Sequence, residues 1–158
     1  MSLDTPSPTK INGAGMRFAV VAARYNEALV DSLVAHTLQT LSDAGAVEPT
    51  LERVPGAMEL PTAAAILTKA EDFDAIIVIG VVIAGDTNHH AIIGDSTAIT
   101  LQQLSLQTGV PIINGILIVE NLAQAEARAG HEINRGKEFA QAALEMAQFK
   151  NKWTKHLK

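Results

Sequence analysis

Two adjacent histidines follow a glycine turn near the middle of the chain, and they are the first residues whose chemistry suggests a function. Residues 74–83 are almost entirely apolar and rich in β-branched side chains, which predicts a strand buried on both faces. This run ends at Gly85, and the spacing becomes helical from Asn88 or His89 onward. Backbone N–H groups at such a helix start favour an anion, and an imidazole is suited to proton transfer near neutral pH.

The helix after this turn is predicted from a seven-residue repeat. Ile92, Ile99 and Leu106 recur at that interval, which is typical of an amphipathic helix. On these residues alone, an anion site and an ordinary helix start are about equally favoured, because many βα turns carry Gly, Asp, Thr and His without a ligand. A metal site is disfavoured, since His89 and His90 would point about 100° apart on a helix and the chain has no Cys.

The composition predicts one domain with a core of aliphatic side chains. Of 158 residues, 47% are hydrophobic and only 18% are charged, so we expect part of the surface to be buried in a homo-oligomer. A net charge of −5 without a Lys/Arg run makes nucleic acid and anionic membranes poor partners. No stretch reaches the roughly 18 apolar residues of a transmembrane helix, and no secretion signal opens the chain, so a cytoplasmic location is expected.

The periodicity predicts strands and helices in alternation. Residues 1–15 are interpreted as an N-terminal arm outside the core, and residues 16–158 as a single domain. Strands are predicted at 16–23, 48–54, 74–83 and 111–118. The helices are expected from an Asn26 cap to Gly45, from Glu59 to Ala70, from His89 onward, from an Asn121 cap to Gly130, and over 135–153. Parallel neighbours need crossover connections, so the predicted fold is an α/β, three-layer α/β/α sandwich with a four-stranded parallel sheet, flavodoxin-like in architecture.

Two of these helices carry apolar stripes from which their buried faces are predicted. The stripe of the first helix consists of Leu29, Val30, Leu33, Val34, Leu38 and Leu41. The stripe of the last helix consists of Phe139, Ala143, Met146 and Trp153.

Ligands in such a sheet bind beyond the carboxyl ends of the strands. The candidate stretches are therefore residues 24–26, 56–59, 85–90 and 114–119. A phosphoacceptor receiver domain needs acidic residues at the end of its first strand to hold Mg²⁺, and here that strand ends in Ala22-Ala23-Arg24. A flavodoxin needs a Ser/Thr/Gly phosphate loop at the same place, and no Walker or dinucleotide glycine pattern occurs. The third βα turn is the place where a phosphate is expected.

Several short motifs, in a fixed order, carry a likeness to a known family. They are Tyr25-Asn26, Val54-Pro55-Gly56-Ala57-Met58-Glu59-Leu60-Pro61, Gly80-Val81-Val82-Ile83, Gly85-Asp86-Thr87-Asn88-His89, Thr108-Gly109-Val110-Pro111, Arg128-Ala129-Gly130 and Asn134-Arg135-Gly136. Over about residues 16–149 the sequence resembles the 6,7-dimethyl-8-ribityllumazine synthases of riboflavin biosynthesis. The order and spacing are specific, because two of the motifs fall on different βα turns of the predicted site.

The resemblance implies a transferase that needs neither cofactor nor metal. Its small-molecule substrates would be 5-amino-6-(D-ribitylamino)uracil and 3,4-dihydroxy-2-butanone 4-phosphate, joined with release of phosphate and water. It implies proton transfer by His89 and stacking of the pyrimidine on Tyr25. The positions implied for substrate binding are Tyr25, Asn26, Ala57, Met58, Glu59, Val81, Val82, Ile83, Asn114 and Arg135, and those implied for phosphate binding are Gly85, Asp86, Thr87 and Arg128. Tyr25 as a rim aromatic, Glu59 as a first-turn carboxylate and Arg128 as a helix-end cation are the ordinary structural alternatives.

The family resemblance also implies assembly into pentamers that remain free, pair, or close into shells. The catalytic site would then be shared by two subunits. We expect Arg128, Asn114 and Arg135 to lie on the side of the third βα turn of their own chain, and Tyr25, Ala57 and Glu59 to come from the neighbour.

The chain departs from the family pattern at several positions around the site. Ala84 stands where an Arg or Lys is common, His90-Ala91 where an aromatic and an acid are common, and Ser96 where an acid is common. Asn114 replaces an aromatic and Arg135 replaces a Lys. The alternatives to an active enzyme are therefore a low-activity or non-catalytic flavin- or lumazine-binding paralogue, and a purely structural ring- or cage-forming protein.

Overall fold

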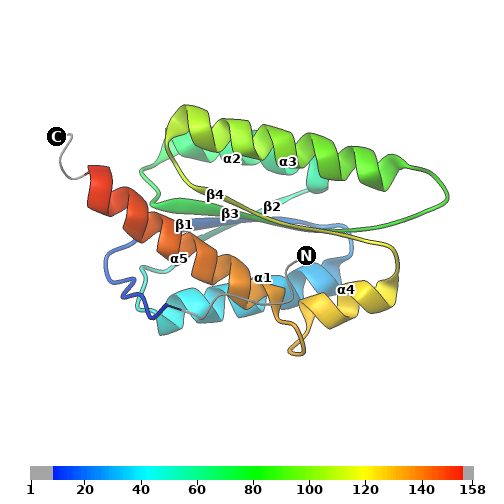
Figure 1. The fold of residues 1–158 in the computed structure, drawn as a ribbon, viewed down its shortest axis with the longest axis horizontal. Coiled ribbons are helices and arrows are strands. Elements are labelled where there is room, and N and C mark those ends of the chain that lie inside the picture. Colours follow the sequence, from blue (N-terminus) through cyan, green and yellow to red (C-terminus); the bar gives the residue numbers. More distant parts are fainter. Residues whose placement is uncertain (1–8, 155–158) are drawn as a thin grey trace.

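The computed structural model describes residues 9–154, which form a parallel sheet covered by helices on both faces (Figure 1). The strands are β1 (Phe18–Ala23), β2 (Thr50–Val54), β3 (Ala75–Ile83) and β4 (Ile112–Val119), in the order β2-β1-β3-β4. The predicted three-layer α/β architecture with four parallel strands is confirmed. Residues 1–8 of the predicted arm and residues 155–158 lie outside the described part of the chain.

The helices divide between the two faces of this sheet. They are α1 (Glu27–Asp43), the short 3-10 helix η1 (Ala57–Glu59), α2 (Leu60–Ala70), α3 (His89–Thr108), α4 (Leu122–Ala129) and α5 (Arg135–Thr154). Figure 1 shows α2 and α3 on one face and α1, α4 and α5 on the other. Asn121 caps α4 as predicted, with its side-chain oxygen accepting the backbone N–H of Gln124 at 3.0 Å.

The central strands explain why the sheet has two cores. Successive side chains of a strand point to opposite faces, so Val20 and Ile77 pack with α1, α4 and α5 while Val21 and Ile76 pack with α2 and α3. Both faces of β1 and of most of β3 are thereby buried. This confirms the inference drawn from the unbroken apolar run at residues 74–83.

The amino-terminal arm reaches the core at one residue. The backbone N–H of Gly13 donates to the carbonyl of Ala44 at 2.8 Å, and Ile11, only 6% exposed, packs in the core beside α1 and α5. The prediction that residues 1–15 lie wholly outside the core is therefore wrong at Ile11. An isolated Ile between polar residues gives no periodic signal from which this contact could have been predicted.

The apolar stripes of α1 and α3 differ in burial. In α1 the stripe packs on the sheet as predicted, with Leu33 fully buried. In α3 the repeat of Ile92, Ile99 and Leu106 faces away from the sheet, with exposed fractions of 59%, 59% and 76%. The face of α3 that packs inward instead consists of Ile93, Thr97 and Leu101. The predicted helix is present, but its longest apolar stripe does not contact its own core.

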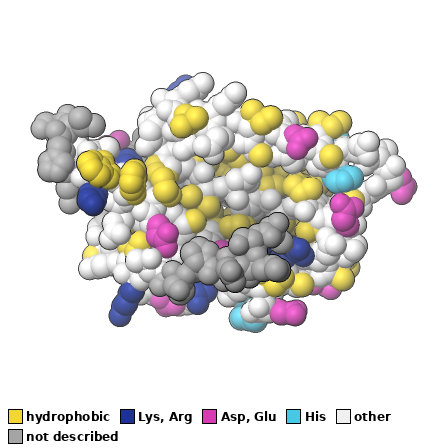
Figure 2. Space-filling view, viewed as in Figure 1, with side chains coloured by type: hydrophobic (Ala, Val, Ile, Leu, Met, Phe, Trp, Pro, Cys, Tyr) yellow, Lys and Arg dark blue, Asp and Glu magenta, His cyan; other side chains and the backbone are white. Residues whose placement is uncertain are grey.

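The stripe predicted for α5 is wrong at its carboxyl end. Ala143 is buried, together with Ala140, Leu144 and Ala147, but Met146 and Trp153 are exposed. Small side chains let α5 pack closely against α1, and the end of the helix runs past the sheet (Figure 1). Met146 and Trp153 are therefore left largely uncovered by residues 9–154. Hydrophobic side chains consequently lie in a row over the carboxyl-terminal part of α5 (Figure 2).

The first turn of α5 is fixed to α1 by a buried contact. A Cβ at Gly136 would overlap the carbonyl oxygen of Leu33, so only glycine allows this approach. The hydroxyl of Thr37, which is fully buried, lies 2.8 Å from the carbonyl oxygen of Leu33 and 3.0 Å from that of Gly136. Gly136 and Thr37 together set where α5 begins.

Candidate functional site

A cavity of about 460 Å³ opens beyond the carboxyl ends of β1 and β3. The chain leaves β1 toward β2 on one side of the sheet and returns to β3 on the other, so the loops diverge at this point and leave a crevice. The predicted site residues that line the cavity are Tyr25, Asn26, Ala57, Met58, Glu59, Val81, Val82, Ile83 and His89. Ala23 and Ile93 also line it and were not predicted, because an ordinary apolar residue carries no chemical signal.

The turn after β1 is held by an asparagine in an unusual conformation. Asn26 has φ 56°, in the left-handed region that Asn tolerates better than most residues. Its side chain makes no cap to α1, contrary to the prediction, and instead donates from Nδ2 to the carbonyl of Val81 at 2.8 Å. This hydrogen bond joins the end of β1 to β3 across the cavity. Tyr25 is left at the rim, 74% exposed, where its ring can stack on a ligand.

The segment after β2 supplies a carboxylate next to that ring. A Cβ at Gly56 would lie 3.3 Å from the Tyr25 ring and 3.2 Å from a carboxylate oxygen of Glu59, so the glycine makes room for both side chains. Ala57 is buried at the base of η1, while Met58 is exposed and its sulfur lies 3.8 Å from the Ser96 hydroxyl. An aromatic face and an anionic acceptor thus meet on one wall of the cavity.

The third βα turn presents backbone donors beside an imidazole. Residues 84–88 form neither helix nor strand, and His89 is the first residue of α3. The side chain of Asn88 makes no capping hydrogen bond, which leaves N–H groups of the first turn available to an anion. His90 Nδ1 lies 3.1 Å from the Thr87 carbonyl oxygen and tethers the turn to the helix. Gly85, Asp86 and Thr87 adjoin the cavity along the chain without lining it.

Three predicted residues lie away from this cavity. Asn114 is exposed in β4, and its Oδ1 accepts the backbone N–H of Ile116 at 3.0 Å. Arg128 in α4 donates to the carbonyl of Gln124 at 3.0 Å, and Arg135 at the start of α5 pairs with Glu138. None of the three lines the cavity that contains His89.

The predicted division of the site between subunits is therefore wrong. Tyr25, Ala57 and Glu59 were expected opposite the third βα turn, from a neighbouring chain, but they line the same cavity as His89 within one chain. The reason is the sheet order, because β1 lies directly between β2 and β3 and brings the three turns together.

Neither a metal-binding cluster nor a membrane-spanning helix is found in the described part of the chain. No group of three or more His, Cys, Asp or Glu side chains in this range is placed to hold a metal ion. Within the same range, no helix is both long and apolar enough to cross a membrane.

Comparison with known proteins gives one consistent family. The profile of the family described as 6,7-dimethyl-8-ribityllumazine synthase matches residues 15–151. The chain is 47% identical over 133 residues to the 6,7-dimethyl-8-ribityllumazine synthase of Stenotrophomonas maltophilia (strain K279a), covering 82% of this chain and 86% of the relative. It is 46% identical to the protein of that name from Xanthomonas oryzae pv. oryzae, with the same coverage, and 43% identical over 136 residues to that of Xylella fastidiosa (strain 9a5c), covering 84% and 88%.

Proposed function

The chain belongs to the 6,7-dimethyl-8-ribityllumazine synthase family, and we propose that it catalyses the reaction for which the family is named. It condenses 5-amino-6-(D-ribitylamino)uracil with 3,4-dihydroxy-2-butanone 4-phosphate and releases phosphate. The observation that carries this proposal is the single cavity in which Tyr25, Glu59 and His89 meet the end of β3. The family assignment expected from the sequence motifs is confirmed.

One part of the cavity suits the uracil substrate. The Tyr25 ring is placed to stack on the planar uracil, and the backbone groups of Val82 and Ile83 are placed to bond its polar edge. Glu59 would accept hydroxyl groups of the ribityl chain. These contacts hold the amine of the uracil in position to attack the ketone of the second substrate.

The third βα turn suits the leaving phosphate. Uncapped N–H groups at the start of α3 favour a dianion there, and His89 lies one residue beyond the cap position. In the proposed mechanism, the imidazole transfers protons as the amine adds to the ketone and as phosphate departs. The protein needs no cofactor for these steps, because each is an addition, an elimination or a proton transfer.

The positions of Asn114, Arg128 and Arg135 support a site completed by a neighbouring subunit. The resemblance assigns all three to substrate or phosphate binding, although Asn114 and Arg135 depart from the common residue types, and all three lie outside the cavity of their own chain. In the revised arrangement, one chain supplies Tyr25, Glu59 and His89, and its neighbour supplies Arg128 with Asn114 and Arg135. A guanidinium suits this role because its planar donors bond two phosphate oxygens at once.

Assembly into a pentamer, or a multiple of pentamers, is the second part of this proposal. The outward stripe of Ile92, Ile99 and Leu106 runs along most of α3, and an apolar stripe of that length needs a partner. Figure 2 shows hydrophobic side chains at the outer surface of the α2 and α3 layer. Light scattering at micromolar concentration should return at least five times the 16.7 kDa subunit mass, and a 16.7 kDa species would contradict assembly.

The catalytic proposal is tested by incubating the protein with both substrates and following the lumazine by its absorbance and fluorescence. Product formed by the wild type, and lost in His89→Ala, is the expected result. Flavin or lumazine binding without turnover would instead identify a binding paralogue. Asn114 and His90, which depart from the family pattern, would then account for the loss of activity. Formation of rings with neither binding nor turnover would identify a structural protein.

The shared site is tested by mixing two inactive proteins. Arg128→Ala and Glu59→Ala lie on opposite halves of the proposed site, so mixed rings contain some interfaces in which both halves are intact. Recovery of activity on mixing is expected, with each variant reassembled alone as the control. Mixed rings that are verified by mass and remain inactive would show that each chain builds its site alone.

A further inference from the structure

The carboxyl-terminal half of α5 presents a row of large apolar side chains to solvent (Figure 2). Met146, Phe149 and Trp153 are 43%, 59% and 58% exposed. Their spacing of three and then four residues places them on one side of the helix. The rings of Phe149 and Trp153 lie next to each other, with centroids 6.4 Å apart. Because aromatic residues are enriched at protein–protein contacts, a group of this kind favours an interaction surface.

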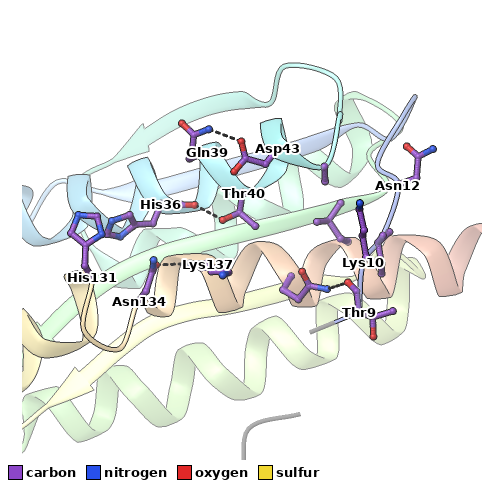
Figure 3. A pocket seen from close by; sticks show the side chains of 14 residues that line it. Thr9, Lys10, Asn12, His36, Gln39, Thr40, Asp43, His131, Asn134 and Lys137 are labelled. Atoms are coloured by element: carbon purple, nitrogen blue, oxygen red, sulfur yellow. Dashed lines mark hydrogen bonds between the residues drawn. The ribbon is translucent and has the colours of Figure 1, made fainter. Parts of the chain in front are cut away.

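The amino-terminal half of the same helix is approached by other segments of its own chain. It borders a cavity of about 810 Å³ between α1 and α5, which His36 of α1 and residues 9–12 of the arm also line (Figure 3). Gln141 of α5 donates from Nε2 to the carbonyl of Thr9 at 2.5 Å. In the carboxyl-terminal half, residues 9–154 leave the outer side of the helix uncovered, as the exposure of Phe149 shows. The apolar row therefore begins where the contacts with the arm end.

This end of α5 is held in place although it runs past the sheet. Lys150 donates from Nζ to the carbonyl of Phe73 at 2.8 Å. Asn151 donates from Nδ2 to Asp74 Oδ1 at 2.9 Å. Phe73 is buried, and Asp74 directly precedes β3, so these two bonds tie one side of the helix to the start of a central strand. The apolar row is presented on a fixed helix, which lowers the entropic cost of binding a partner.

One acid and one base lie beside the row. Glu145 and Lys152 are both exposed, and their separation of seven residues is about two helical turns, so they lie on the same side of α5. Neither forms an ion pair with any residue of the range 9–154. Glu145 accepts a hydrogen bond from Gln141 Nε2 at 3.1 Å. The ammonium group of Lys152 lies 5.5 Å from the centre of the Trp153 ring.

This spacing of the two charges makes the face complementary to itself. If two copies of α5 lie antiparallel across a two-fold axis near Phe149, residues before the axis in one copy lie beside residues after it in the other. Glu145 of each copy then lies beside Lys152 of the other, and the two apolar rows meet between these pairs. A partner of another sequence would need its own acid and base at the matching spacing, whereas a second copy of the chain carries them already.

We propose that this face of α5 binds the same face of a second copy of the chain across a two-fold axis. The row extends only about 10 Å along the helix, which is too short for a stable interface by itself. Its strength comes from the ring proposed above, on which this inference rests. That ring uses α3 on the other face of the sheet, so the α5 face stays available on every subunit (Figure 1).

The expected assembly is therefore larger than one ring. Two rings that meet through the α5 faces of all their subunits repeat the same contact around the ring. Weak contacts that form together reinforce one another, because each holds the next pair at high effective concentration. The contact does not include any residue that lines the catalytic cavity, so single rings should keep their turnover.

The test is the mass of the full chain, measured by light scattering and native mass spectrometry over a range of concentrations. The wild type at micromolar concentration should exceed five times the subunit mass of 16.7 kDa, a pair of rings being the smallest such species. Phe149→Glu should separate it into single rings, because it places a carboxylate at the centre of the apolar contact. Ala35→Glu, at an exposed position of α1 on the same face of the sheet, is the matched control and should leave the mass unchanged.

Charge reversal distinguishes a contact between copies from binding of another molecule. Glu145→Lys alone and Lys152→Glu alone should each raise the concentration needed for ring pairing at least about tenfold, because like charges then face each other in every repeat of the contact. The double variant, which carries both substitutions, has opposite charges across the two-fold axis again and should recover pairing. Neither a different protein nor a lipid surface would be restored by that exchange.

The contact and the ring fail in different ways. Wild-type protein that stays as single rings, paired rings that survive Phe149→Glu, or a double variant that pairs no better than the single variants would each overturn the α5 contact. A species of two chains that Phe149→Glu separates would support the α5 contact and contradict the ring. Single chains at every concentration would contradict both.

Discussion

Helices α1 and α3 both carry apolar stripes and lie on opposite faces of the sheet, yet they use these apolar side chains differently. Each follows a strand that ends at the catalytic cavity, and each begins beside a residue that lines it, Asn26 or His89. Leu33 of α1 is fully buried against its own sheet, whereas Ile99 of α3 is 59% exposed. An apolar repeat therefore identifies a helix without saying what the helix packs against. In a subunit of an assembly, the longest stripe can belong to the neighbour.

The largest effect is expected from a charge placed in the middle of the α3 stripe. Ile99→Asp should leave the subunit folded but disperse the ring, because an unpaired carboxylate buried at an apolar interface is strongly unfavourable. Activity should be lost with the ring, since the proposed site needs two chains. Light scattering and circular dichroism measure the two effects. Ala35→Asp, at an exposed position of α1, is the control, and a ring that survives Ile99→Asp would remove α3 from the interface.

We expect the start of α3, unlike the start of α1, to supply a proton-transfer group. His89→Ala is expected to lower kcat by about 10- to 10⁴-fold, the range for losing a positioned proton-transfer group. Stability should change little, because the His89 side chain is exposed. Steady-state kinetics and urea unfolding on the same preparation measure both quantities. His90→Ala, at the next position, should have a smaller effect on kcat. Full turnover by the His89→Ala variant would show that His89 takes no part in proton transfer.

The two stripes should differ in what they contribute to the fold. Leu33→Ala removes a fully buried side chain and should lower the free energy of unfolding by about 2–5 kcal/mol. Ile99→Ala should change the stability of the separated subunit by less than about 0.5 kcal/mol, and its effect should grow only when rings are present. Urea unfolding over a range of protein concentrations distinguishes the two. Equal losses at every concentration would mean that both helices serve the same core.

A smaller loss of stability than that of Leu33→Ala is expected at Asn26, which precedes α1. Asn26→Ala loses the hydrogen bond to the Val81 carbonyl and places alanine at φ 56°, so a loss of about 1–2 kcal/mol is expected. Asn26→Gly keeps the conformation and loses only the hydrogen bond, and it should fall between the wild type and Asn26→Ala. Thermal unfolding of the three proteins measures this order of stability. An Asn26→Ala variant as stable as the wild type would show that the hydrogen bond between β1 and β3 does not stabilise the fold.

The features that could be predicted from sequence are those with local causes. The unbroken apolar run of β3 and the Asn121 cap each leave a signal within a few residues, and both are found in the structure. The features that could not be predicted depend on contacts between distant segments. Asn26 has the residue type of a cap, but its side chain bonds Val81, 55 positions away.

The catalytic cavity shows the same limit. The motifs name the residues, and the sheet order brings Tyr25, Glu59 and His89 together. The stretches 24–26, 56–59 and 85–90 were predicted at the carboxyl edge of the sheet, but the strand order that decides which of them line one cavity has no local signal in the sequence. The packing of Ile11 in the core and the cavity between α1 and α5 that His36 lines likewise bring together segments far apart in the sequence. Single residues of ordinary type give no sequence signal from which either could be predicted.

The buried contact between Thr37 and Gly136 has a consequence for how such a sequence can evolve. Gly136 follows Arg135 directly, so the position of that arginine depends on a hydroxyl inside α1. In the proposed ring, the affinity of another subunit for its substrate would depend on the same hydroxyl. If the proposed site is shared between subunits, a change at position 37 therefore alters a catalytic site that this side chain never touches, in a different copy of the chain. Natural substitutions at positions 37 and 136 should be accepted together or not at all, and selection for turnover should restrain both as strictly as selection for folding does.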